Sequence, residues 1–103
     1  MELEQLMLHI EALVFASDRP LPQMEIVELT RNTFTEESIE GEQESVALEA
    51  IYEKYDSNFY PFGLVEIGGG FQFLTKKQYH QTVLQLNGDK YIKKLSAAAM
   101  ETL

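Results

Sequence analysis

Apolar residues recur at helical spacing from the first residues of the chain. Within residues 2–17, an amphipathic helix is predicted by the i, i+3, i+4 spacing of Leu3, Leu6, Met7, Ile10, Leu13 and Val14. The pattern ends before Pro20, because proline disfavours a helical conformation in the residue that precedes it. The sequence therefore predicts a first helix of about four turns.

Two further helices are predicted before the middle of the chain. The second begins at Pro22, whose missing N–H is tolerated in a first helical turn, and runs to about Asn32. Its apolar side is expected to comprise Met24, Ile26 or Val27, and Leu29. Gly41 is expected to interrupt or precede the third helix, which ends at the turn-forming residues 56–58. The apolar stripe of this third helix is Leu48, Ile51, Tyr52 and Tyr55.

Three consecutive glycines separate two segments in which side chains alternate with a period of two. Residues 64–67 and 71–74 both predict half-buried strands, and a tight hairpin turn between them is formed by Gly68, Gly69 and Gly70. We expect Gly69 or Gly70 to adopt a positive φ. A dinucleotide-binding loop would need a third glycine where Phe73 stands, and a helix rather than a strand after it. The glycines are therefore interpreted as a structural turn.

The chain after the hairpin predicts a domain boundary. A fourth, short helix is indicated by Tyr79, Val83, Leu84 and Leu86. Asn87, Gly88 and Asp89 end it, a basic segment follows at residues 90–94, and Ser96 could cap a new helix. We expect residues 1–88 to form one domain and residues 89–103 to form a linker and the truncated start of a second domain.

Composition narrows the functional classes. The 103 residues suit one small domain, and the absence of cysteine excludes disulfides and thiolate metal sites. No apolar run reaches the roughly 18–20 residues that span a bilayer, and the acidic N-terminal segment does not resemble a signal peptide. We expect a cytoplasmic protein without membrane contact. The net charge of −9 disfavours general nucleic-acid binding.

The search for reactive chemistry yields no catalytic or metal site. His9 and His80 are far apart in sequence, no H-E-x-x-H pattern occurs, and the glutamates of residues 36–42 lack calcium-loop spacing. We expect no enzyme activity and no cofactor; a hydrolase that uses the glutamate-rich segment has no supporting spacing. The aromatic residues near the hairpin are either core or a partner-binding patch. The candidate dimer or partner interface comprises Leu3, Leu6, Ile10, Phe59 and Phe62.

The order of elements predicts an α+β winged helix-turn-helix domain: three main helices, a β-hairpin wing and a short following helix. In a DNA-binding member of this fold, the third helix would present a basic face. Here that helix carries one lysine, Lys54, against Glu42, Glu44, Glu49, Glu53 and Asp56. The fold alone favours a DNA-binding transcriptional regulator, whereas the acidic third helix argues against DNA binding.

Three blocks of the sequence resemble the segregation and condensation protein B family. They are "IEALVFASDRPLP" at residues 10–22, "LVEIGGGFQFLTKKQY" at residues 64–79 and "KKLSAAAMETL" at residues 93–103. Residues 32–43 match poorly, and Pro22 stands where the family often has serine. The blocks resemble the family's opening signature, its wing and the start of its second domain.

This resemblance implies a non-enzymatic subunit of the bacterial condensin-like complex. Members form homodimers and bind a kleisin subunit and, through it, the structural-maintenance-of-chromosomes ATPase. The complex supports chromosome condensation and segregation, and hence cell division. The resemblance also implies a nucleoid-associated location in the cytoplasm and dimerisation through this N-terminal winged helix. From the net charge of −9 and the acidic third helix, we expect DNA contact to be at most indirect or weak.

Overall fold

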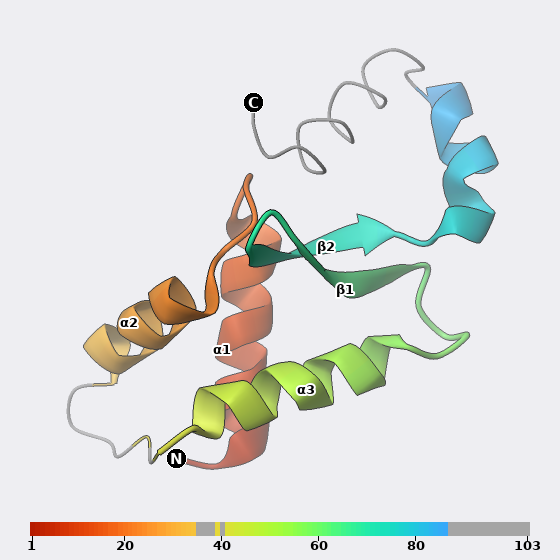
Figure 1. Ribbon diagram of the computed structural model, residues 1–103. Helices are drawn as coiled ribbons and strands as arrows, with labels where there is room; N and C mark the ends of the chain where they lie inside the picture. The colour runs from red at the N-terminus through yellow and green to blue at the C-terminus, as the bar shows by residue number, and fades with distance from the viewer. Residues whose placement is uncertain (35–38, 40, 87–103) are drawn as a thin grey trace.

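The computed structural model describes residues 1–34, 39 and 41–86, and it has the predicted order of elements (Figure 1). The helices are α1 (Leu3–Ala16), α2 (Gln23–Thr33) and α3 (Gln43–Tyr55). The strands β1 (Phe62–Ile67) and β2 (Gly70–Thr75) form an antiparallel hairpin. The 3₁₀ turn η1 (Lys77–Tyr79) leads into helical residues 80–86. This is the α+β winged helix expected from the sequence. The predicted linker and second-domain start, residues 89–103, lie outside the described residues.

Helix α1 forms the centre of the domain. It packs against α2, α3 and β2, so that one side of the helix is buried along its whole length (Figure 1). The core that results comprises Leu6, Ile10, Val14, Leu21, Ile26, Ile39, Ala47, Leu48, Ile51 and Leu64. The stripe predicted for this helix is confirmed, since three of its members are fully buried and the others pack against them.

The predicted apolar side of α2 is partly wrong. Pro22 is the N-cap residue, in extended conformation, rather than part of the first turn. Met24 is 84% exposed, whereas Ile26 and Thr30 are buried. Residues four apart share a helical face, while Met24, two positions before Ile26, points to the other side. Thr30 tolerates burial because its hydroxyl donates a hydrogen bond of 2.9 Å to the Ile26 carbonyl.

The third helix begins after Gly41, which has a φ of +56° and precedes the helix without interrupting it. Leu48 and Ile51 are buried as predicted, but Tyr52 is largely exposed. Ala47 completes the buried side in its place. Burial therefore follows the side of α3 that faces α1 and the hairpin. The predicted stripe is wrong only at Tyr52, since Tyr55 packs against the core as expected.

The three glycines at the hairpin have different roles. Gly68 and Gly69 form a two-residue turn with φ values of +57° and +78°, as such a hairpin requires. The positive φ expected at Gly69 is confirmed. Gly70 is not part of this turn: it begins β2 and pairs with Ile67. A Cβ atom on Gly70 would lie 2.7 Å from the Leu21 carbonyl carbon, so glycine is required there for space rather than for φ.

The segment between α1 and α2 lies along the outer edge of β2. The Leu21 N–H donates to the Phe71 carbonyl at 3.0 Å, and the Phe71 N–H donates to the Leu21 carbonyl at 2.8 Å. This bridge joins the front of the chain to the wing.

No helix among the described residues is long and apolar enough to cross a membrane.

Candidate partner-binding surface

Two of the predicted interface residues are core residues. Leu6 and Ile10 are 0% exposed, because the side of α1 on which they lie is covered by the other elements. Leu3 is partly buried against the same core. The prediction that Leu6 and Ile10 would be left over for a partner is therefore wrong: the regular apolar stripe that identified them is the stripe that the domain's own core uses.

The outward side of α1 carries exposed apolar side chains that the sequence reasoning missed. Leu8 is 60% and Phe15 is 79% exposed. They are seven residues apart, and exposed Ala12 lies between them on the same helical face. The sequence could have indicated the exposure of Leu8 and Phe15, because both are large apolar residues that lie outside the buried stripe of the helix. We call Leu8, Ala12 and Phe15 the outer face of α1.

The aromatic residues near the wing separate into packed and exposed groups. The Phe62 ring centroid lies 5.5 Å from that of Tyr55 and 5.8 Å from that of Phe73, and the Tyr55 and Phe73 centroids are 5.0 Å apart. The Tyr55 hydroxyl donates a 2.6 Å hydrogen bond to the Glu11 carboxylate, and burial together with this carboxylate raises the pKa of Tyr55 to about 12. Phe59 is 91% exposed. Of the two aromatic interface candidates, Phe59 is thus accessible, and Phe62 belongs to a packed cluster.

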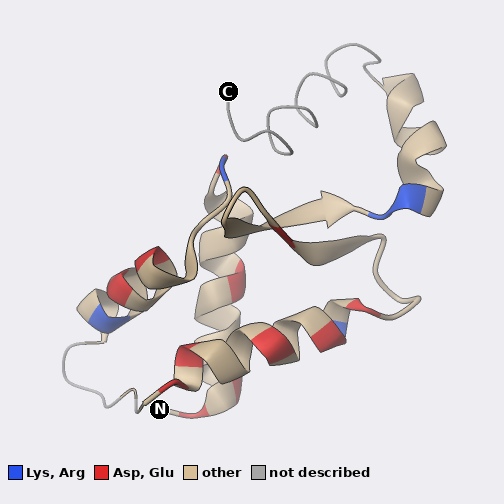
Figure 2. Cartoon of the chain, in the orientation of Figure 1, with Lys and Arg blue, Asp and Glu red and all other residues tan. Residues whose placement is uncertain are grey.

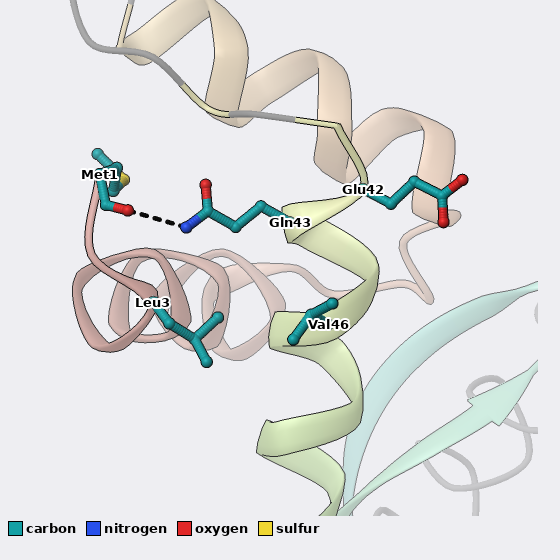
Figure 3. A pocket seen from close by; sticks show the side chains of 5 residues that line it. All are labelled: Met1, Leu3, Glu42, Gln43 and Val46. Carbon is teal, nitrogen blue, oxygen red and sulfur yellow. Dashed lines mark hydrogen bonds between the residues drawn. The ribbon is translucent and has the colours of Figure 1, made fainter.

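A first hollow, of about 550 Å³, lies between the N-terminal ends of α1 and α3 (Figure 3). It is lined by Met1, Leu3, Glu42, Gln43 and Val46. The Gln43 side-chain amide donates to the Met1 carbonyl at 2.8 Å, while the Glu42 carboxylate points away from Leu3 (Figure 3). Leu3 and the exposed Val46 provide apolar walls. The hollow thus presents apolar surface with no acid–base pair directed into it.

A second hollow, of about 620 Å³, lies between α3 and β1. Its lining comprises Gln23, Ser45, Leu48, Glu49, Tyr52, Leu64, Val65, Glu66 and Phe71. Leu48 and Leu64 are buried, whereas Glu49 and Glu66 are exposed. We call this hollow the α3–β1 groove. It combines an apolar floor with two carboxylates and no cationic lining residue.

One glutamate of α3 is not part of the acidic surface. Glu44 is buried and accepts hydrogen bonds from the Arg31 guanidinium at 2.8 and 3.0 Å. The Arg31 hydrogen bonds hold the pKa of Glu44 below its ordinary value, although burial opposes this shift. The pair joins α2 to the first turn of α3, where the helix dipole also favours a carboxylate. Periodicity gave no sign of it, since the partners are thirteen positions apart.

The remaining carboxylates make the outward side of α3 acidic (Figure 2). Glu42, Glu49 and Glu53 are all exposed. Lys54, the single lysine of the helix, forms an ion pair of 3.1 Å with Glu11 on α1. A phosphate backbone would be repelled by this surface.

The histidines have packing roles in the described structure. His9 lies edge-to-face on Phe34 with a centroid distance of 4.7 Å, and His80 Nε2 lies 3.0 Å from the Thr75 carbonyl oxygen. Among residues 1–34, 39 and 41–86, no group of three or more His, Cys, Asp or Glu side chains could hold a metal ion.

Comparisons with known proteins agree with the fold and identify a family. A family model described as "Segregation and condensation complex subunit ScpB" matches residues 8–103. A solved structure, a conserved hypothetical protein from Chlorobium tepidum, is similar with a TM-score of 0.66 and 24% sequence identity. The match covers 91% of this chain and 55% of that protein, so the chain spans about half its length. No curated protein matches the chain significantly.

Proposed function

The chain belongs to the family of the segregation and condensation complex subunit ScpB, and from this premise we propose that it is a non-enzymatic subunit of a bacterial condensin-like complex. In this proposal the chain forms a homodimer in the cytoplasm. It binds the kleisin subunit and, through it, acts on the structural-maintenance-of-chromosomes ATPase. The family match over residues 8–103 is the observation that carries the proposal.

The charge of α3 supports a protein-binding role over the alternative of a DNA-binding transcriptional regulator. The helix that would enter the major groove in a DNA-binding winged helix presents Glu42, Glu49 and Glu53 to solvent. Each carboxylate near a phosphate costs Coulomb energy, and no described cation of α3 offsets this cost, since Lys54 is engaged by Glu11.

For self-association we propose the outer face of α1 in place of Leu6 and Ile10. Phe15 and Leu8 are large apolar side chains on one exposed helical face, and a two-fold contact between copies would bury both from each chain. Leu3 and Phe59 remain candidates for contact with the kleisin, because both retain accessible surface.

Analytical ultracentrifugation over a micromolar concentration range tests the dimer. We expect the parent chain to sediment as a dimer and Phe15→Asp to sediment as a folded monomer. Met24→Asp is the matched control, since Met24 is as exposed as Phe15 but lies on α2. A monomeric parent at the highest concentration, or equal effects of the two variants, would refute the assignment of the interface to α1.

Two binding measurements separate the proposed function from its alternative. Co-purification with the kleisin of the same cell is expected to succeed. A duplex-DNA shift assay at physiological salt is expected to show no submicromolar binding. Tight DNA binding without kleisin binding would establish the transcriptional regulator instead.

A further inference from the structure

The α3–β1 groove lies across the core-facing side of the hairpin. Leu64 and Glu66 are two residues apart on β1, and Glu66 is opposite Phe71 of β2, so the three side chains share one face. Leu64 is buried and Phe71 packs against the core, which identifies this face as the one turned toward the helices. Gln23 borders the groove two residues after Leu21, which pairs with the outer edge of β2. The groove is thus bounded by α3, the start of α2 and the core-facing side of the hairpin.

Glu66 departs from the apolar pattern of this side of the hairpin. Four side chains on the same face are apolar, namely Phe62, Leu64, Phe71 and Phe73. A carboxylate among them cannot join the core without losing its hydration, and Glu66 is exposed at the groove instead. Among the described residues it forms no ion pair. A position that breaks the local pattern without a compensating contact is typical of a functional site.

Helix α3 adds a second carboxylate and an aromatic ring to the groove. Glu49 and Tyr52 are three residues apart, so they lie on one side of the helix, and both are exposed. Glu49, like Glu66, forms no ion pair within the described part of the chain, and the groove lining contains no lysine or arginine. Buried Leu48 and Leu64 form the floor. The groove therefore combines an apolar floor and an aromatic ring with two carboxylates that lack a cation.

We propose that the α3–β1 groove binds a segment of a partner protein that inserts an arginine side chain flanked by apolar residues. The guanidinium donates hydrogen bonds to the carboxylates of Glu49 and Glu66, and its plane stacks on the Tyr52 ring. The apolar neighbours of the arginine cover Leu48 and Leu64. Arginine suits this site better than lysine, because its planar fork matches a carboxylate and stacks on an aromatic ring, whereas the lysine ammonium is compact and strongly hydrated.

The size of the groove and the charge of the chain favour this occupant. A volume of about 620 Å³ accommodates a few side chains rather than a folded domain. The net charge of −9 attracts a basic segment over long distances. The proposal rests on the chain's proposed role as a protein-binding subunit.

A peptide titration tests the chemistry of the occupant. The probe is a short fluorescein-labelled peptide with one arginine between leucines, and its binding to the full chain is read by fluorescence anisotropy. We expect saturable binding that weakens as the salt concentration rises. Replacing the arginine by citrulline, which keeps its shape and removes its charge, should reduce affinity about tenfold, and replacing it by lysine about threefold. A lack of saturable binding, or an unchanged affinity of the citrulline or the lysine peptide, would refute the proposal.

Three variants of the chain test the location of the bound peptide. We expect Glu66→Gln to reduce affinity about fivefold and Tyr52→Leu about threefold. The matched control is Glu53→Gln, which removes a carboxylate from α3 outside the groove lining and should change affinity less than about twofold. Since Glu53 and Glu66 are both exposed, neither glutamine variant should change Tm appreciably. Equal losses of affinity in these two variants would refute the groove as the site.

The chain's own basic segment, residues 90–94, is the competing occupant. In the full chain, Lys90→Gln/Lys93→Gln/Lys94→Gln should raise peptide affinity less than about threefold, through the change in net charge alone. A rise of about tenfold or more would show that this segment fills the groove and would overturn the proposal. Peptide binding without kleisin co-purification would refute the proposed function and support the groove as a site, whereas kleisin co-purification without peptide binding would refute the groove alone.

Discussion

The closest backbone approach at the wing leads to a prediction about Gly70. In Gly70→Ala, the new Cβ would lie 2.7 Å from the carbonyl carbon of Leu21, 2.8 Å from that of Pro20 and 2.9 Å from the Leu21 nitrogen. All three are backbone atoms, so no side-chain rotation can relieve the contact. The segment at Leu21 must move away from β2, and the two hydrogen bonds between Leu21 and Phe71 are then stretched or broken.

The expected cost follows from these contacts. Overpacking in a filled site costs about 1–3 kcal/mol, and each lost backbone hydrogen bond adds about 0.5–1.5 kcal/mol. The free energy of unfolding should therefore fall by about 2–6 kcal/mol, which is a large part of the roughly 5–15 kcal/mol typical of small domains. For a domain of this size, at about 4–8 °C for each kcal/mol, that change lowers Tm by about 10–50 °C.

Gly69→Ala is the matched control for this reasoning. Gly69 has a φ of +78°, and an added Cβ there meets nothing within 4 Å. Its cost is limited to the left-handed backbone penalty of about 1–2 kcal/mol. Thermal unfolding followed by circular dichroism compares the two variants, and amide hydrogen exchange at Leu21 and Phe71 should accelerate in Gly70→Ala alone. A Gly70→Ala variant that is as stable as the parent, or more stable than Gly69→Ala, would refute the steric argument.

Two further predictions concern buried polar contacts. Glu44→Gln should lower the free energy of unfolding by about 2 kcal/mol at pH 7, because it weakens a charge-assisted pair with Arg31. The pKa of Glu44 is depressed below its ordinary value of 4.5, so the stabilisation by this carboxylate is present above pH 4.5 and is lost as the pH falls. Urea unfolding at pH 3 should therefore show a smaller difference in the free energy of unfolding between the parent and Glu44→Gln than at pH 7. An unchanged difference would contradict the role given to the Glu44–Arg31 pair. Tyr55→Phe should cost about 1 kcal/mol through the lost hydrogen bond to Glu11. The pKa of Tyr55 is raised from its ordinary value of 10 to about 12, so the parent should also lose stability as the pH rises from 10 to 12. If Tyr55→Phe loses the same stability over this pH range, another group is responsible.

The order of elements could be predicted from the sequence because each signal is local. The stripe of α1 repeats within one helix, and Gly68 and Gly69 supply the positive φ values that a two-residue hairpin needs. Pro20 ends the first helical pattern through a clash with its immediate neighbour. Periodicity, turn chemistry and proline sterics all act over a few residues, so they can be recognised without knowledge of the fold.

The candidate surface could be predicted only in part. An apolar stripe indicates that one side of α1 is covered, but it does not say whether the domain or a partner covers it. For that reason the sequence prediction places Leu6 and Ile10 at a partner interface, whereas the structure buries both in the core of the domain. Phe59 is exposed, and its assignment to a partner interface stays a prediction, whereas Phe62 packs against Tyr55.

The winged-helix order, the hairpin turn and the acidic character of α3 can be predicted from the amino-acid sequence, since these depend on residue type and short-range spacing. Two other features depend on the tertiary structure: the burial of Glu44 against Arg31 and the need for glycine at position 70. Each depends on the distance between segments that are far apart along the chain, such as Leu21 and Phe71. Such distances are set when all the helices and the hairpin pack together, because close packing leaves each segment one position relative to the others.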